Sequence, residues 1–136
     1  MNTPIHTPNA PAAIGPYSQA VQAGSMLFVS GQIPIDPATG AFAGEDISTQ
    51  ARQSLTNVKN ILEAAGYTLA DVVKTTVLLD DMANFAAVNA VYSEFFTENC
   101  PARACFAAKA LPKGDRAVAE VIYRDGTHLD TIYNVK

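Results

Sequence analysis

Two segments of the chain carry apolar residues at spacings of three and four, with polar residues between them. They span residues 47–65 and 83–98. This period matches the turn of an α-helix, so each segment is predicted to form an amphipathic helix with one face on a core. Asp46 or Ser48 can cap the first helix by accepting from its free backbone amides, and Gly66 suits the left-handed conformation just past its end.

Five other segments are short, rich in apolar or β-branched residues and bounded by turn residues, which is typical of strands. The sequence Ala23-Gly24-Ser25 predicts a hairpin turn between the first two. The third carries apolar groups on both faces, so it is expected inside a sheet rather than at its edge. In chain order, the predicted strands are residues 17–22, 26–33, 72–79, 102–110 and 116–124.

The predicted elements follow the order ββαβαββ, which indicates an α+β fold. Crossover connections within one sheet share a right hand, so both helices are expected on one face of a mixed sheet, in two layers. The 136 residues suit one domain, residues 1–136, in which residues 125–136 form a polar tail with little predicted structure. The second face of the sheet would expose apolar side chains, so self-association is predicted to bury it.

Charge and apolar content narrow the classes of function. The formal net charge is −4, and the first basic residue is Arg52. Nucleic-acid binding is therefore not expected, because counterion release needs clustered cations. No stretch is apolar for long enough to span a membrane and no signal segment is recognisable, so a soluble cytoplasmic protein is expected. The only cysteines, Cys100 and Cys105, are too few for a disulfide scaffold and are expected as free thiols.

The sequence lacks the common motifs for cofactors and metals. It contains no phosphate-binding loop, no dinucleotide-binding glycine motif, no zinc-protease motif and no Cys-x-x-Cys pair. His6 and His128 lie near opposite termini without neighbours at ligand spacing, so no metal site is expected. Any chemistry must come from isolated polar residues within apolar strands.

Arg103, Cys105 and Glu120 are the main candidates for such chemistry. Arg103 and Cys105 are two residues apart, so both should lie on one face of their strand. Glu120 has no opposite charge within three residues, which makes it a candidate acid or base. Arg103 could bind an external carboxylate with its planar fork, or it could pair with Glu120 to hold adjacent strands together, with Cys105 as apolar filler. Cys105 lacks a nearby histidine base, which argues against covalent catalysis.

Tyr17, Ser30 and Gly31 also allow two interpretations. Tyr17 follows Gly15-Pro16 and would either pack against that turn or contact a ligand. Ser30-Gly31 would form either a bulge in its strand or a pair of backbone donors for a ligand. Composition and spacing alone favour the structural interpretation in both cases.

Seven segments, in order, resemble the reactive intermediate deaminases of the RidA/YjgF type, in particular the 2-iminobutanoate/2-iminopropanoate deaminase subgroup. The resemblance extends over residues 8–124. The matching segments are A-P-A-A-I-G-P-Y-S-Q-A, S-G-Q-I-P, Q-A-R-Q-S-L-T-N-V-K-N-I-L-E-A-A-G, V-V-K-T-T-V, F-A-A-V-N-A-V-Y, P-A-R-A-C and A-L-P-K-G.

The resemblance implies a chorismate-mutase-like α+β fold, assembled as a homotrimer with three clefts between subunits. It also implies hydrolysis of small 2-imino acids, such as 2-iminopropanoate and 2-iminobutanoate derived from 2-aminoacrylate and 2-aminocrotonate, to 2-keto acids and ammonia. Neither a cofactor nor a metal is implied.

The resemblance further implies roles for individual residues. Arg103 matches the arginine that clamps the substrate carboxylate, and Glu120 matches the glutamate that positions or activates the attacking water. Cys105 matches a residue that contacts the ligand through its backbone. The other matching positions for substrate binding are Tyr17, Ser30, Gly31 and Asn89.

The sequence also departs from the family pattern. The loop before P-A-R-A-C is shortened, and Cys100 stands where an aromatic residue is usual. The last strand reads A-V-A-E-V where V-E-I-E-A is usual, so Val118 occupies the first acidic position and Glu120 is the acidic residue that remains. Some relatives are described as ligand-binding or chaperone-like proteins, or as endoribonucleases and translation inhibitors, so binding without catalysis stays an alternative. The acidic charge argues against RNA.

Overall fold

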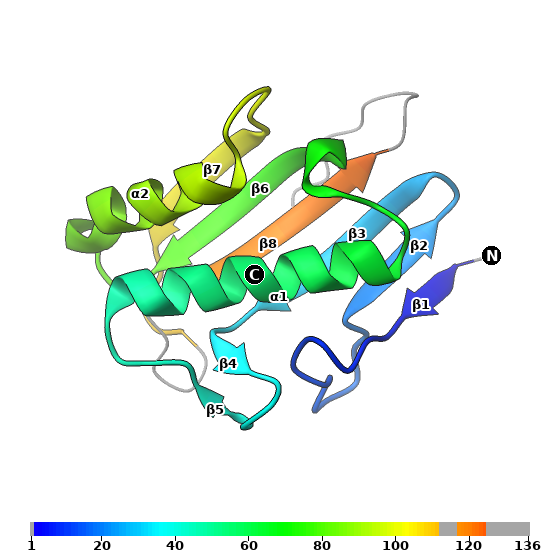
Figure 1. Cartoon of the computed structure of the whole chain (residues 1–136), viewed down its shortest axis with the longest axis horizontal. Coiled ribbons are helices and arrows are strands. Elements are labelled where there is room, and N and C mark those ends of the chain that lie inside the picture. The colour runs from blue at the N-terminus through cyan, green and yellow to red at the C-terminus, as the bar shows by residue number, and fades with distance from the viewer. Residues whose placement is uncertain (1, 112–116, 125–136) are drawn as a thin grey trace.

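The computed structural model describes residues 2–111 and the backbone of residues 117–124. Six strands form one mixed sheet, in which only β6 and β7 run parallel to each other (Figure 1). Their order across the sheet is β1-β2-β3-β8-β6-β7. The strands are β1 (Thr3–Ile5), β2 (Ala20–Ala23), β3 (Met26–Gln32), β6 (Val72–Leu79), β7 (Ala102–Ala107) and β8 (Ala117–Arg124). A separate short hairpin consists of β4 (Ile35–Asp36) and β5 (Ala41–Phe42).

Helices α1 (Ile47–Ala64) and α2 (Phe85–Phe95) lie on the same face of the sheet, as Figure 1 shows. The α+β class, the mixed sheet and the two layers expected from the sequence are confirmed. Short 3-10 helices, η1 (Leu69–Asp71) and η2 (Met82–Asn84), precede β6 and α2. In the part of the chain that the structure describes, no helix is both long and apolar enough to cross a membrane.

The ends of α1 follow the rules that its sequence suggests. The Asp46 carboxylate accepts the Thr49 backbone N–H at 2.9 Å, so Asp46 is the cap and Ser48 is inside the helix. Gly66 has a φ of +83°, the left-handed conformation expected past the helix end. The apolar stripe of α1, which includes Leu55, Val58 and Ile61, is buried on the sheet side of the helix.

Among residues 2–111 and 117–124, no helix covers the opposite face of the sheet. In the register, Val21 of β2 lies opposite Phe28 of β3, and Leu78 of β6 lies beside Phe106 of β7. These positions alternate with buried ones such as Leu27 and Leu79, so they belong to the helix-free face. Phe106 is 49% exposed. This apolar face is the one that self-association is predicted to bury.

Several element boundaries differ from the sequence predictions. The first predicted strand starts at Ala20 rather than residue 17, and the fourth ends at Ala107 rather than residue 110. The second helix is shorter, residues 85–95, because η2 takes up its first turn. The strand β1 was not expected. The predictions for the loop after Leu111 and for the tail 125–136 lie outside the described residues.

Candidate active site

Arg103 lies on β7, at the edge of the sheet, and two aromatic rings of α2 hold its side chain. Its guanidinium carbon is 4.7 Å from the centre of the Tyr92 ring and 5.5 Å from the centre of the Phe85 ring. The side chain is half-buried, and it makes no hydrogen bond or ion pair with any described residue. The described residues therefore take none of the five N–H donors of its planar fork, a group suited to binding an anion.

The Tyr92 ring is itself held by a hydrogen bond to strand β6, on which Thr75 lies. Its hydroxyl lies 2.7 Å from the Thr75 hydroxyl, and both residues are buried. Burial raises the pKa of Tyr92, and the hydrogen bond with Thr75 offsets part of this increase. In the register Thr75 is the partner of Arg103, so β6, α2 and β7 meet at this point.

Cys105 lies on the same face of β7 as Arg103, as its spacing predicts. Its register partner is the buried Val77, and its side chain packs against the core under the helices. Burial raises the pKa of its thiol, with a smaller opposing effect from the Arg103 charge. Both Cys100 and Cys105 are free thiols. The thiol is therefore packed against apolar residues and is less readily ionised than a free cysteine.

Asn89 lies on α2, four residues after Phe85 and three before Tyr92. This spacing puts it on the side of the helix that carries both rings. Asn89 is half-buried, and its side chain makes no hydrogen bond with any residue in the described ranges. Arg103 and Cys105 therefore share one face of β7, and Asn89 lies on the side of α2 whose rings contact Arg103.

Glu120 is not on a strand next to Arg103. Strand β6 lies between β7 and β8, and the register places the Glu120 backbone opposite Thr76. The interpretation of Arg103 and Glu120 as a pair that ties adjacent strands is therefore wrong. On its other side, β8 pairs with β3. The register of this pair shifts between Val29 and Gln32 of β3, which is the stretch opposite Glu120.

Ser30 and Gly31 form this irregularity, so the bulge predicted at this position is confirmed. Two residues of β3 face one residue of β8 there. The Ser30 hydroxyl donates to the Ser18 carbonyl at 2.6 Å, and the buried Gln32 donates to the Ser30 carbonyl at 3.1 Å. These bonds fix the bulge, which brings Ser30, Gly31 and Glu120 together in a second group.

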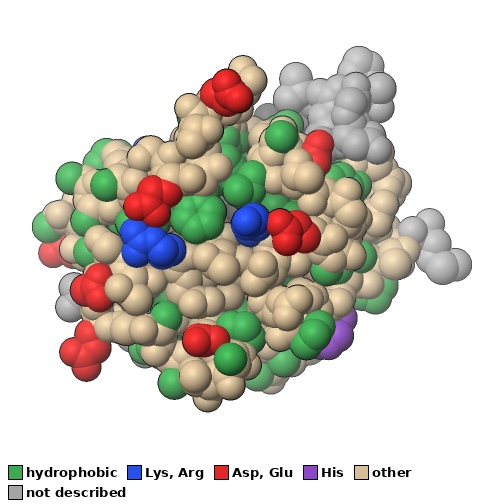
Figure 2. All heavy atoms as spheres, viewed as in Figure 1, with side chains coloured by type: hydrophobic (Ala, Val, Ile, Leu, Met, Phe, Trp, Pro, Cys, Tyr) green, Lys and Arg blue, Asp and Glu red, His purple; other side chains and the backbone are tan. Residues whose placement is uncertain are grey.

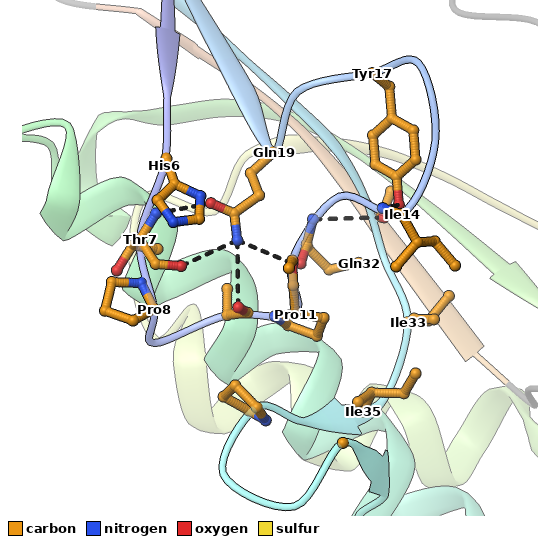
Figure 3. Close-up of a pocket in the computed structure, with 15 residues that line it drawn as sticks. His6, Thr7, Pro8, Pro11, Ile14, Tyr17, Gln19, Gln32, Ile33 and Ile35 are labelled. Atoms are coloured by element: carbon orange, nitrogen blue, oxygen red, sulfur yellow. Dashed lines mark hydrogen bonds between the residues drawn. The ribbon is translucent and has the colours of Figure 1, made fainter.

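Tyr17 and Gly31 line a pocket of about 470 Å³ next to this bulge (Figure 3). Most of the wall is apolar and comes from Ile14, Ile33, Ile35 and several prolines and alanines of the N-terminal segment. Tyr17 is 52% exposed, and its hydroxyl accepts the Ile14 backbone N–H at 3.4 Å. Sequence reasoning identified Tyr17 and Gly31 but missed Gln19 and Gln32, whose amides hold this wall in place.

An ion pair joins the two helices on the face that they form. Arg52 of α1 and Glu94 of α2 form an exposed ion pair at 3.0 Å, and Figure 2 shows acidic and basic side chains beside one another on this face. Among the described residues, no cluster of histidine, cysteine and carboxylate side chains is suited to a metal ion. The polar groups of interest are therefore those at the β7 edge and at the β3 bulge.

Comparison with known proteins gives consistent matches over most of the chain. The family model described as endoribonuclease L-PSP matches residues 7–122. A protein of Salmonella typhimurium named 2-iminobutanoate/2-iminopropanoate deaminase is 57% identical over 125 residues, which cover 90% of this chain and 97% of that protein. The Escherichia coli protein of the same name is 52% identical over the same shares of both chains.

Solved structures agree with these matches. The YjgF gene product of Escherichia coli has a TM-score of 0.87 and 50% identity, over 90% of this chain and 98% of that one. The Escherichia coli protein TdcF, solved with bound serine, has a TM-score of 0.88 and 45% identity, over 91% and 99% of the two chains.

Proposed function

The chain belongs to the endoribonuclease L-PSP family, which includes the RidA/YjgF proteins, and from this premise we propose that it is a hydrolytic deaminase of reactive 2-imino acids. Its substrates are small compounds such as 2-iminopropanoate and 2-iminobutanoate, and its products are 2-keto acids and ammonia. The names of relatives that are 52% and 57% identical over nine-tenths of the chain support this reaction.

The observation that carries the proposal is that no described residue forms a hydrogen bond or ion pair with Arg103. Among the described residues, the half-buried guanidinium contacts two ring faces, which accept none of its N–H donors, so its fork can donate to a bound carboxylate. Every 2-imino acid has a carboxylate next to its reacting carbon, and the guanidinium fork matches that group with two parallel hydrogen bonds. The relative TdcF, which was solved with serine bound, also takes a ligand with such a carboxylate.

In the proposed reaction, Arg103 holds the carboxylate and thereby fixes the neighbouring imine carbon. Water adds to this carbon and forms a C–O bond, while the electron pair of the C=N bond moves to nitrogen. Glu120 accepts a proton from the water and passes it to the nitrogen, which gives a carbinolamine with one hydroxyl and one amino group. Glu120 then takes the hydroxyl proton and gives it to the amino group; the C–N bond breaks, ammonia leaves with the electron pair of that bond, and the C=O bond of the ketone forms. An activated imine reacts readily with water, so the protein needs only to orient the substrate and to place one water molecule against the imine carbon.

The proposed site also requires more than one subunit. Three strand spacings separate β3 from β7, roughly 14 Å, which is far longer than a three- or four-carbon acid. Tyr17, Ser30 and Gly31 therefore cannot contact the same substrate as Arg103 of their own chain. We propose a homotrimer in which the β3 bulge of one subunit faces the β7 edge of the next. The apolar, helix-free face of the sheet supplies a surface for that assembly.

Imine hydrolysis in competition with semicarbazide tests the proposal. The imine is generated enzymatically from an amino acid, and semicarbazide traps whatever the protein does not hydrolyse. The wild-type protein should divert the imine from the trap, whereas Arg103→Ala and Glu120→Ala should not. Arg52→Ala is the matched control, because Arg52 is exposed and paired with Glu94 on the helix face.

Two results would contradict parts of the proposal. If Arg103→Ala is inactive and Glu120→Ala is fully active, the carboxylate clamp stands and another group places the water. If the folded wild-type protein diverts no imine but binds 2-ketobutanoate in calorimetry, the protein is a carboxylate-binding module rather than an enzyme.

A further inference from the structure

Arg103 lies on an edge strand, so only one neighbouring strand fixes its backbone. A long, flexible side chain at such a position would sample many conformations, and a substrate would have to select one of them. In this protein the side chain is instead held over two rings of α2. We propose that Tyr92, together with Phe85, is a positioning residue that orients Arg103 for carboxylate binding, an inference that rests on the proposed function.

The spacing of the two rings explains how one helix can hold one guanidinium. Phe85 and Tyr92 are seven residues apart, two helical turns, so both rings project from the same side of α2. Their centres lie 5.5 Å and 4.7 Å from the Arg103 guanidinium carbon, within the range of a cation–π interaction. Attraction to a ring face acts on the positive charge and needs no hydrogen-bond acceptor, so the guanidinium fork stays available to a carboxylate.

Tyr92 can orient Arg103 because its own ring cannot move freely. The Thr75 hydroxyl lies 2.7 Å from the Tyr92 hydroxyl, and the Phe96 ring packs against the Tyr92 ring with centres 4.7 Å apart. Thr75 is 1% exposed and is the register partner of Arg103. The contacts therefore run from an interior strand through Tyr92 to the guanidinium, and they fix its direction relative to the sheet.

Steady-state kinetics of imine hydrolysis with Tyr92→Leu tests the inference. Loss of the ring should raise KM for 2-iminobutanoate about tenfold and leave kcat within about twofold, because binding of the carboxylate weakens while the water-placing group is untouched. Tyr92→Phe keeps the ring, so its KM should stay within about threefold of wild type. Tyr67→Leu is the matched control, since it removes another buried tyrosine ring, whose hydroxyl donates to the Ser25 carbonyl at 3.1 Å, and both of its kinetic constants should be unchanged.

The outcomes separate this inference from the proposed function. If Arg103→Ala abolishes turnover but Tyr92→Leu and Tyr67→Leu behave alike, the clamp stands and Tyr92 is only a core residue. If Arg103→Ala leaves KM unchanged, the clamp itself fails and the positioning role fails with it. Should Tyr92→Leu not fold, Phe85→Leu replaces it, because Phe85 is only half-buried; an unchanged KM there would overturn the inference.

Discussion

The side-chain amide of Gln19 binds both backbone groups of Thr7. Its Oε1 accepts the Thr7 N–H at 2.7 Å, and its Nε2 donates to the Thr7 carbonyl at 3.1 Å (Figure 3). The same nitrogen lies within hydrogen-bond distance of the carbonyls of Ala10 and Pro11. Gln19 is 2% exposed, so one buried amide holds the N-terminal segment that forms a wall of the pocket.

Gln19→Leu should therefore destabilise the protein by about 2–4 kcal/mol, because it leaves several backbone groups without partners in the interior. Urea denaturation followed by circular dichroism measures this loss. Gln22→Leu is the matched control, since among the described residues the Gln22 side chain makes a single, exposed hydrogen bond, to the Gly24 carbonyl. Equal stability losses in the two variants would contradict the role of Gln19.

Features that depend on nearby residues could be predicted from the sequence. The Asp46 cap, the left-handed Gly66, the hairpin turn at Gly24 and the strand over residues 72–79 all follow from local rules, and all are present. The position of Arg103 and Cys105 on the same face of β7 could also be predicted from nearby residues, because successive side chains of a strand point to alternate faces.

Features that depend on distant partners could not be predicted in this way. The strand β1 has three residues and a proline, and it becomes a strand only by pairing with β2. Strand β7 pairs with β6 through the α2 crossover, and β8 inserts between β3 and β6, so Arg103 and Glu120 are separated although β7 and β8 follow one another in sequence. Helical spacing predicts that one face of residues 83–98, which include Tyr92, packs on a core, but it could not indicate that the Tyr92 ring would contact Arg103.

The raised pKa of Tyr92 predicts a loss of stability at high pH. A phenol whose pKa in the folded state lies above its ordinary value of 10.0 resists ionisation while folded. Its contribution to stability is fully present below pH 10.0 and is lost as the pH rises through the folded-state value. The stability advantage of wild type over Tyr92→Phe, measured by urea denaturation, should therefore shrink above pH 10.0 and be constant between pH 7 and 9. A constant difference across the whole range would refute this prediction.

The two thiols should differ in reactivity. The thiolate is the nucleophile, and burial raises the pKa of Cys105, whereas Cys100 is exposed. Iodoacetamide at pH 8 should therefore alkylate Cys100 at least about tenfold faster than Cys105, as followed by peptide mass spectrometry. Cys100→Ser and Cys105→Ser provide single-thiol proteins as controls. Faster alkylation of Cys105 would indicate an activated thiol and would reopen a nucleophilic role for it.

Arg103→Lys should lower kcat/KM for 2-iminobutanoate about 10- to 100-fold, although the charge is retained. An ammonium group cannot form two parallel hydrogen bonds to a carboxylate, and it is too compact to contact both rings of α2 as the planar guanidinium does. The semicarbazide competition assay measures the effect, and Arg52→Lys serves as the matched substitution on the helix face. Full activity of Arg103→Lys would show that charge alone is sufficient.

Mixing two inactive variants should restore activity if each site is shared between subunits. Arg103→Ala removes the proposed clamp at the β7 edge, and Tyr17→Ala alters the pocket beside the β3 bulge. In mixed trimers, a site is intact when its bulge comes from an Arg103→Ala subunit and its β7 edge from a Tyr17→Ala subunit. Random mixing of equal amounts gives this combination at about a quarter of the sites. Co-expressed and co-refolded proteins should thus recover about a quarter of wild-type activity, with sedimentation velocity confirming trimers. If both parts of a site came from one chain, no mixture would contain an intact site, and activity would stay at the level of the parent variants.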